Sequence, residues 1–176
     1  MAESKTLIFI IEDDPIYRQM LFDHLSQMSH LDIKEFGTGE ECLTFIQNNK
    51  VTPSIVFLDY YLNSMVKDAR DGLDILVELK KILPETEVVM LSGQDKIQVA
   101  VEVMKYGSFD YIVKGESAFY RAEKAVFNIY RFAKLKKNAS LYKKLTITFA
   151  VAFLIMIICF IVLQRKGLIT NTPGWF

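Results

Sequence analysis

Four short apolar runs in this chain each end at a polar residue that could take part in phosphoryl transfer. Glu12 ends the first run and is followed by two aspartates, while Asp59, Ser92 and Lys114 end the next three. The runs comprise residues 7–11, 55–58, 88–91 and 111–113. If they are strands of a parallel sheet, their carboxyl ends lie at one edge, where open α/β sheets bind ligands. We therefore expect these side chains to form one site.

The sequence between these runs predicts the helices that position them. Asp14 and Pro15 have the pattern of an N-cap and a first helical residue, and residues 33–36 predict a further strand. The alternation of strand and helix predicts an α/β fold with a parallel sheet of five strands and helices on both faces. Apolar residues mark five predicted helices: Tyr17, Leu21, Leu25 and Met28 share one face of the first, Cys42, Leu43 and Ile46 lie on the second, Leu73, Leu76, Leu79 and Leu83 lie on the third, Val99, Val103 and Met104 are predicted to face inward from the fourth, and Ala122, Val126, Ile129 and Phe132 lie on the fifth.

Charge divides the chain near residue 130. All 21 acidic residues lie at or before Glu123, so residues 1–130 carry a net charge of −8 and the remainder carries +8. Residues 145–163 form an uncharged stretch of 19 residues, which as a helix would span about 28 Å, close to the hydrocarbon thickness of a bilayer. Because this stretch is apolar on all faces and flanked by basic residues, we expect a transmembrane helix in place of the buried core helix of a soluble protein.

Two observations predict that the first 130 residues lie in the cytoplasm. The only early apolar run is followed at once by acidic residues, so no secretory signal is expected. Within about 20 positions of the predicted span, six basic residues precede it and two follow it, as the positive-inside rule requires. We expect a cytoplasmic domain in residues 1–130, a basic linker continuing the last helix in 131–144, a single transmembrane helix in 145–163 and a short extracytoplasmic tail in 164–176. Cys42 and Cys159 provide no disulfide framework or metal motif.

Five short motifs follow one another in the first 130 residues. They are IIEDDP at 10–15, IVFLD at 55–59, DGL at 71–73, VVMLSG at 88–93 and GSFDYIVK at 107–114. In this order and spacing they resemble the receiver domains of two-component response regulators, including the chemotaxis-regulator type. The resemblance implies a flavodoxin-like fold, a Mg²⁺ ion, and phosphorylation by a histidine kinase or a phosphotransfer protein.

The resemblance also implies a role for each strand-end residue. Asp59 is the expected phosphoacceptor, Ser92 and Lys114 are expected to contact the phosphoryl group, and Ser92 with Tyr111 forms the expected switch. The expected ligands of Mg²⁺ are Glu12, Asp13, Asp59 and the backbone carbonyl of Tyr61. A carboxylate that attacks a phosphohistidine brings two anions together, which explains the need for a hard cation with oxygen ligands. The remaining task is positioning and charge neutralisation, to which Lys114 would contribute.

Taken singly, these residues have simpler interpretations. The acidic cluster could be a solvated strand end with an N-cap, Asp59 a turn residue and Lys114 a surface charge, but their co-occurrence favours a site. His24 and His30 have no matching partners in the sequence, and we do not expect them to bind a metal.

Three features depart from the family pattern. The sequence NSMVKDAR is inserted at residues 63–70, which enlarges the loop beside the expected metal. Gly115 stands where the family commonly has proline, so we expect a trans peptide bond after Lys114. Tyr61 is a bulky residue two positions after the acceptor, and we hypothesise that it shields the acyl phosphate from water.

We therefore predict a membrane-anchored response regulator that is a phosphoacceptor and not an enzyme, although it could lose its own phosphoryl group to water. Its expected partners are a histidine kinase or phosphotransfer protein, a downstream protein that the sequence does not identify, and membrane lipid near the basic linker; nucleic acid is not expected. Two alternatives are a phosphatase with an aspartate nucleophile and an interaction protein at the membrane that is never phosphorylated.

Overall fold

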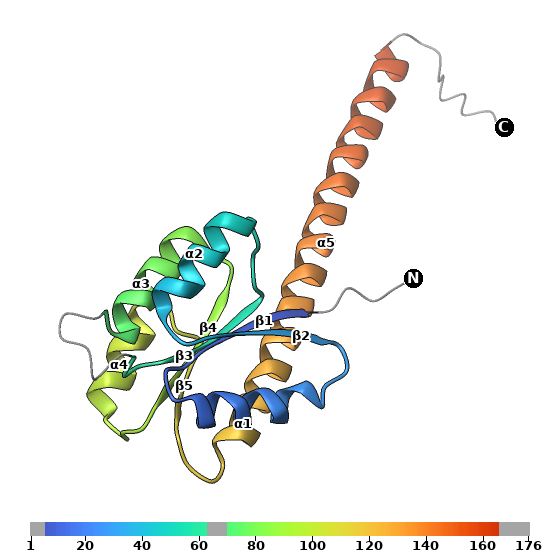
Figure 1. Ribbon diagram of the computed structural model, residues 1–176. Coiled ribbons are helices and arrows are strands. Elements are labelled where there is room, and N and C mark those ends of the chain that lie inside the picture. The colour runs from blue at the N-terminus through green and yellow to red at the C-terminus, as the bar shows by residue number, and fades with distance from the viewer. Residues whose placement is uncertain (1–5, 63–69, 166–176) are drawn as a thin grey trace, which may run out of the picture. The chain divides into compact units, whose positions relative to one another are not determined.

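The computed structural model describes residues 6–62 and 70–165. The chain divides into two compact units, Met1–Ile129 and Tyr130–Phe176. In the first unit, strands and helices alternate along the chain (Figure 1). The strands are β1 (Thr6–Ile11), β2 (Leu31–Phe36), β3 (Ile55–Asp59), β4 (Glu87–Ser92) and β5 (Asp110–Val113). Four of them start and end within one residue of the predicted ranges, and β2 begins two residues earlier than predicted.

The five strands form one parallel sheet in the order β2-β1-β3-β4-β5. Central strands β1, β3 and β4 consist largely of Val, Ile, Leu and Phe, as expected for strands covered on both faces. The register pairs Ile11 with Leu58, Asp59 with Leu91, and Ser92 with Val113. The strands that carry the candidate site therefore end at nearly the same level.

Helices cover both faces of the sheet (Figure 1). One face packs against α2 (Gly39–Asn49), α3 (Gly72–Ile82) and α4 (Ile97–Lys105), and the other against α1 (Pro15–Ser26) and the first part of α5 (Ala118–Arg165). The predicted α/β fold, a flavodoxin-like parallel sheet with helices on both faces, is confirmed for this unit.

Alternate residues of each central strand enter two separate hydrophobic cores. On β1, for example, Phe9 and Ile11 pack towards α2, α3 and α4, whereas Ile8 and Ile10 pack towards α1 and α5. All four side chains are fully buried. The two-residue period of a strand thus fixes the sheet between its helical layers.

Side chains cap three of the helices at their N-termini. Asp14, Thr38 and Asp71 each accept a hydrogen bond from a backbone N–H in the first turn of the helix that follows. Pro15 occupies the first position of α1, as predicted. These caps fix where α1, α2 and α3 begin.

One predicted inward position is wrong, and the apolar pattern of α5 extends beyond its buried part. Met104 on α4 is 42% exposed, because this short helix buries only a narrow stripe in which Val103 is the fully covered residue. Phe132 is 56% exposed, and Ile129 is the last buried residue of α5 among those whose side chains the structure describes. The helical period identified both helices but not how much of each is covered.

In the second unit, the described residues form the remainder of α5. Within it, Lys144–Arg165 is the one stretch of the described chain that is long and apolar enough to cross a membrane, with a mean hydropathy of 3.0 and no buried residues. The hydroxyls of Thr146 and Thr148 donate hydrogen bonds to carbonyls one turn earlier in the helix, which satisfies these polar groups without water. This stretch contains the predicted span, while most of the predicted tail lies outside the described residues.

Candidate functional site

The register of the sheet brings the ends of β1, β3 and β5 to one edge. Ile11 pairs with Leu58, which places Glu12 beside Asp59 immediately after the paired residues. On the other side of β4, the backbone N–H of Lys114 donates to the carbonyl of Ser92 at 2.7 Å. The predicted convergence of the strand-end residues is therefore present in the fold.

Lys114 joins the two buried carboxylates. Its Nζ lies 2.9 Å from Oε1 and 2.8 Å from Oε2 of Glu12, and 3.0 Å from Oδ1 of Asp59. The side chain of Glu12 is completely buried and that of Asp59 nearly so. A single ammonium thus neutralises part of the charge of two carboxylates from different strands.

Burial dominates the electrostatics of these groups. Burial and the neighbouring Asp59 raise the pKa of Glu12 to about 7, and burial likewise raises the pKa of Asp59 despite the opposing effect of Lys114. Burial disfavours the charged form of Lys114, but Asp59 and Glu12 outweigh it and raise its pKa. The site therefore holds more negative charge than one lysine can stabilise, as expected where a cation binds.

Glu12, Asp13 and Asp59 form a group that fits a divalent cation. Each offers a carboxylate oxygen, and these oxygens lie within 4.8 Å of one another. Oε2 of Glu12 and Oδ1 of Asp59 are buried and accept no hydrogen bond from the described residues, although Lys114 is close to both. An all-oxygen donor set of this kind suits Mg²⁺. Asp14 has a different role, because its Oδ1 caps α1.

Arg18 on α1 fixes the turn that carries these acidic residues. Its Nη1 donates to the carbonyl of Glu12 at 2.5 Å, and its Nε lies 3.9 Å from Oε2 of Glu35 on β2. No sequence motif indicates this role of Arg18, because the contact joins a side chain to the backbone across a turn.

Ser92 and Tyr111 share one hydrogen-bond acceptor. The Ser92 hydroxyl donates to the Gln94 carbonyl at 3.3 Å, and the Tyr111 hydroxyl donates to the same oxygen at 2.6 Å. Both residues are buried, with Tyr111 only 7% exposed. The two predicted switch residues are therefore linked through the backbone of the loop between β4 and α4.

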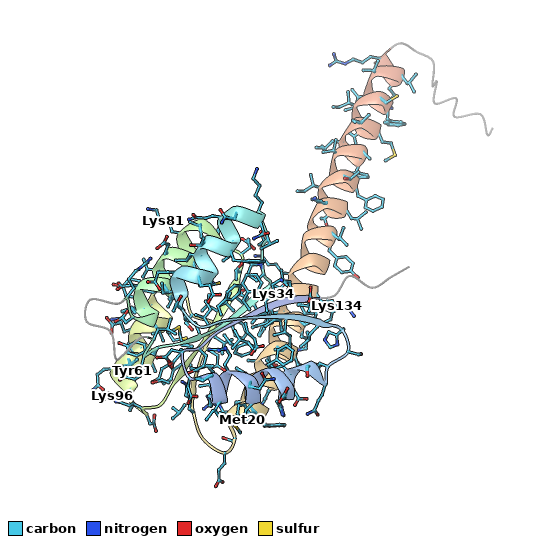
Figure 2. The ribbon with its side chains drawn as sticks, viewed as in Figure 1. Met20, Lys34, Tyr61, Lys81, Lys96 and Lys134 are labelled. Carbon is cyan, nitrogen blue, oxygen red and sulfur yellow. The ribbon has the colours of Figure 1, made fainter. Side chains whose placement is uncertain are left out.

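Tyr61 lies at the same end of the sheet as Lys96, as Figure 2 shows. Its backbone N–H donates to the Asp59 carboxylate, which partly offsets the rise in the pKa of Asp59. Its ring packs edge-on against Tyr60, with ring centroids 4.9 Å apart. The Tyr61 carbonyl as a metal ligand stays a prediction, and all of the inserted segment 63–70 except Arg70 lies outside the described residues.

Two glycines near the site behave differently. No cis peptide bond occurs among the described residues, so the trans bond expected between Lys114 and Gly115 is confirmed. Gly72, at the start of α3, approaches β3 so closely that a β-carbon there would lie 2.1 Å from the carbonyl oxygen of Asp59. The DGL motif contained this signal, but only the structure shows that the glycine makes room for the backbone of Asp59.

Comparisons with known proteins support one family. The model of the response regulator receiver domain matches residues 8–119. The transcriptional regulatory protein MalR of Bacillus subtilis is 24% identical over 147 residues, which are 78% of this chain and 60% of MalR. The luminescence regulatory protein LuxO of Vibrio campbellii is 29% identical over 129 residues, which are 73% of this chain and 26% of LuxO. The chain thus spans less than two thirds of the length of these relatives.

Solved structures show the same fold. The signal receiver domain of a putative LuxO repressor protein from Vibrio parahaemolyticus has a TM-score of 0.64 and 22% identity, covering 76% of this chain and 95% of that domain. NtrX from Brucella abortus has a TM-score of 0.61 and 30% identity, covering 74% of this chain and 29% of NtrX. Because the family model matches more than half of the sequence, this chain belongs to the response regulator receiver domain family.

Proposed function

We propose that this protein is a membrane-anchored response regulator whose receiver unit accepts a phosphoryl group on Asp59 in the presence of Mg²⁺. One observation carries the proposal: a buried Asp59 carboxylate lies in contact with Lys114 and within ligand distance of two further acidic side chains. The phosphodonor we propose is the phosphohistidine of a histidine kinase or phosphotransfer protein.

In this mechanism, an oxygen of the Asp59 carboxylate forms a bond to phosphorus as the bond from phosphorus to the donor nitrogen breaks. Lys114 lies 3.0 Å from Oδ1 of Asp59, where its ammonium would neutralise charge on the transferred group. Mg²⁺ held by Glu12, Asp13 and Asp59 would supply the remaining positive charge. The unit acts as a phosphoacceptor and not as an enzyme, and the acyl phosphate is lost when water attacks it. Tyr61 would shield that bond from water.

The loop after β4 would report whether Asp59 is phosphorylated. If a phosphoryl oxygen accepts a hydrogen bond from the Ser92 hydroxyl, that hydroxyl can no longer donate to the Gln94 carbonyl. The carbonyl would then keep only one of these two hydrogen bonds, the one from Tyr111. Tyr111 would then follow the loop, so the population of loop conformations would shift with phosphorylation.

The surface next to this loop is suited to a downstream protein. Ile97, Val101 and Met104 of α4 are exposed apolar side chains, and exposed apolar patches often bind partners. We propose that α4, β5 and the first part of α5 form the face that the switch presents.

The second unit would place this signalling at a membrane. The helix Lys144–Arg165 supports a single span by its length and composition, and the basic residues of 131–144 would lie on the cytoplasmic side. Each Lys or Arg there could attract anionic lipid by about 1 kcal/mol.

Incubating the protein with acetyl phosphate and Mg²⁺ tests the proposed function. Intact-mass spectrometry should show the addition of one phosphoryl group, and the addition should be lost with EDTA and in Asp59→Asn. Ser26→Ala, which changes a hydroxyl at the far end of α1, is a matched control that should still be modified. Absence of an Asp59-dependent mass increase would leave an interaction protein that is never phosphorylated as the better account.

A further inference from the structure

The ring of Tyr17 on α1 contacts the ammonium of Lys114. The Lys114 Nζ lies 4.7 Å from the centroid of the ring, within the distance of about 6 Å over which cation–π attraction is significant. The same nitrogen contacts Glu12 and Asp59, and the Lys114 side chain is only 18% exposed. Two carboxylates and one aromatic ring therefore surround this ammonium.

A second aromatic residue holds the Tyr17 ring. Phe119 of α5 packs against it with ring centroids 5.3 Å apart and an angle of 34° between the rings. Phe119 also stacks on His24 of α1 at 5.9 Å, and Nε2 of His24 lies 3.2 Å from Oε2 of Glu123. These contacts fix the ring between α1 and α5. His24 therefore takes part in packing between α1 and α5, a role that the sequence did not indicate.

The contact depends on the ring of Tyr17 and not on its hydroxyl. The hydroxyl oxygen is buried and has no hydrogen-bond partner within the described part of the chain. Because it neither donates to a carboxylate nor accepts from Lys114, removing it should leave the contact with the ammonium intact.

We propose that Tyr17 is a positioning residue that holds Lys114 over Asp59. An aromatic face attracts an ammonium through its π electrons, and it presents no oxygen or nitrogen atom that would accept a hydrogen bond. The ring thus keeps Lys114 at the site without adding a hydrogen-bond acceptor to Glu12 and Asp59. It would therefore not compete with an oxygen of an incoming phosphoryl group for the N–H groups of Lys114. A carboxylate or amide in place of Tyr17 would instead compete for those N–H groups. The phosphoryl-transfer part of this inference rests on the proposed function.

Matched variants separate this role from simple packing between α1 and α5. Tyr17→Leu keeps an apolar side chain but removes the aromatic face, whereas Tyr17→Phe keeps that face and removes only the hydroxyl. Tyr120→Leu makes the same chemical change at a position of α5 that is 65% exposed. Lys114→Ala removes the ammonium itself.

The first experiment measures the initial rate of phosphorylation by acetyl phosphate in the full chain, reconstituted in phospholipid nanodiscs with saturating Mg²⁺. Tyr17→Leu should slow the reaction about two- to fivefold, as expected from loss of a partly exposed cation–π contact. Tyr17→Phe and Tyr120→Leu should both be phosphorylated at the rate of the wild type. In the Lys114→Ala background, Tyr17→Leu should cause no further loss. Equal slowing in both backgrounds would overturn the positioning role.

The second experiment needs no phosphorylation. Hydrogen–deuterium exchange of the β3 and β4 amides in the same nanodiscs gives the opening equilibrium for the four combinations of wild type, Tyr17→Leu and Lys114→Ala. We expect the two changes to couple by about two- to fivefold in that equilibrium constant; strictly additive effects would show that Tyr17 does not hold Lys114. If the wild type accepts no phosphoryl group, the proposed function fails, and this coupling still decides whether the contact exists.

Discussion

Gly72→Ala is expected to disturb Asp59 without changing any charge at the site. A β-carbon at position 72 would lie 2.1 Å from the carbonyl oxygen of Asp59 and 2.7 Å from the Cα of Tyr60. Ordinary contacts of a β-carbon begin near 3.4 Å, so the backbone must move by more than an ångström. Because both atoms belong to the backbone at the end of a central strand, no side-chain rotation can relieve the clash.

The size of the effect follows from this geometry. Over-packing costs about 1–3 kcal/mol, and a clash with backbone belongs at the upper end of that range. In a unit of this size, about 3 kcal/mol lowers Tm by about 10 °C. A displacement of about 1 Å at a reacting group can slow a reaction about 100-fold, so phosphorylation of Asp59 should slow by up to that factor.

The assays are thermal melting by circular dichroism and phosphorylation by acetyl phosphate, both on a fragment of residues 1–136 that contains the whole sheet and both cores. Gly93→Ala and Gly115→Ala are matched controls, because a β-carbon at either position would have no heavy-atom neighbour within 4 Å. Both controls should melt within a few degrees of the wild type. If Gly72→Ala has the same Tm as these controls and is phosphorylated as fast as they are, the close approach of α3 to Asp59 has no consequence and the reasoning is refuted.

Three further predictions concern the acidic residues and Tyr61. Burial and Asp59 raise the pKa of Glu12 from 4.5 to about 7, so ionisation of Glu12 opposes folding. Without metal, the free energy of unfolding should therefore fall by on the order of 3 kcal/mol as the pH rises from the lower of these pKa values to above the higher one. Urea unfolding in EDTA should show that Glu12→Gln lacks this fall, and equal pH slopes would contradict the prediction. Mg²⁺ at a hundred times its Kd should stabilise the fragment by about 2.7 kcal/mol, and thermal melting should show that Asp13→Asn loses most of this gain; a full gain would exclude Asp13 as a ligand. Tyr61→Ala should release labelled phosphate faster than the wild type, and an unchanged half-life would remove its shielding role.

The strand ends could be predicted because two local signals coincide there. An apolar run reports a buried strand, and a polar residue directly after it must lie at the edge of the sheet. Asp59 and Lys114 were therefore placed correctly without knowledge of the strand order. The helical caps at Asp14 and Asp71 are equally local, since each side chain accepts a hydrogen bond from a backbone N–H group no more than three residues away.

Contacts between distant parts of the chain could not be predicted in this way. The ring of Tyr17 meets Lys114 and Phe119 only after α1 and α5 pack on the same face of the sheet. The helical period predicted that Tyr17 shares one face of its helix with Leu21 and Leu25, but not which side chains it meets. Met104 was misplaced for a related reason, because the width of the covered stripe on α4 depends on how that helix packs against the sheet.

Identification of the residue that carries the phosphoryl group tests the central claim most directly. After incubation with acetyl phosphate and Mg²⁺, reduction with borohydride converts an aspartyl phosphate to homoserine, which peptide mass mapping can locate in the sequence. We predict homoserine at position 59 and at no other aspartate, and no conversion when Mg²⁺ is withheld. Homoserine at a different position, or phosphorylation that persists in Asp59→Asn, would contradict the assignment of Asp59 as the phosphoacceptor.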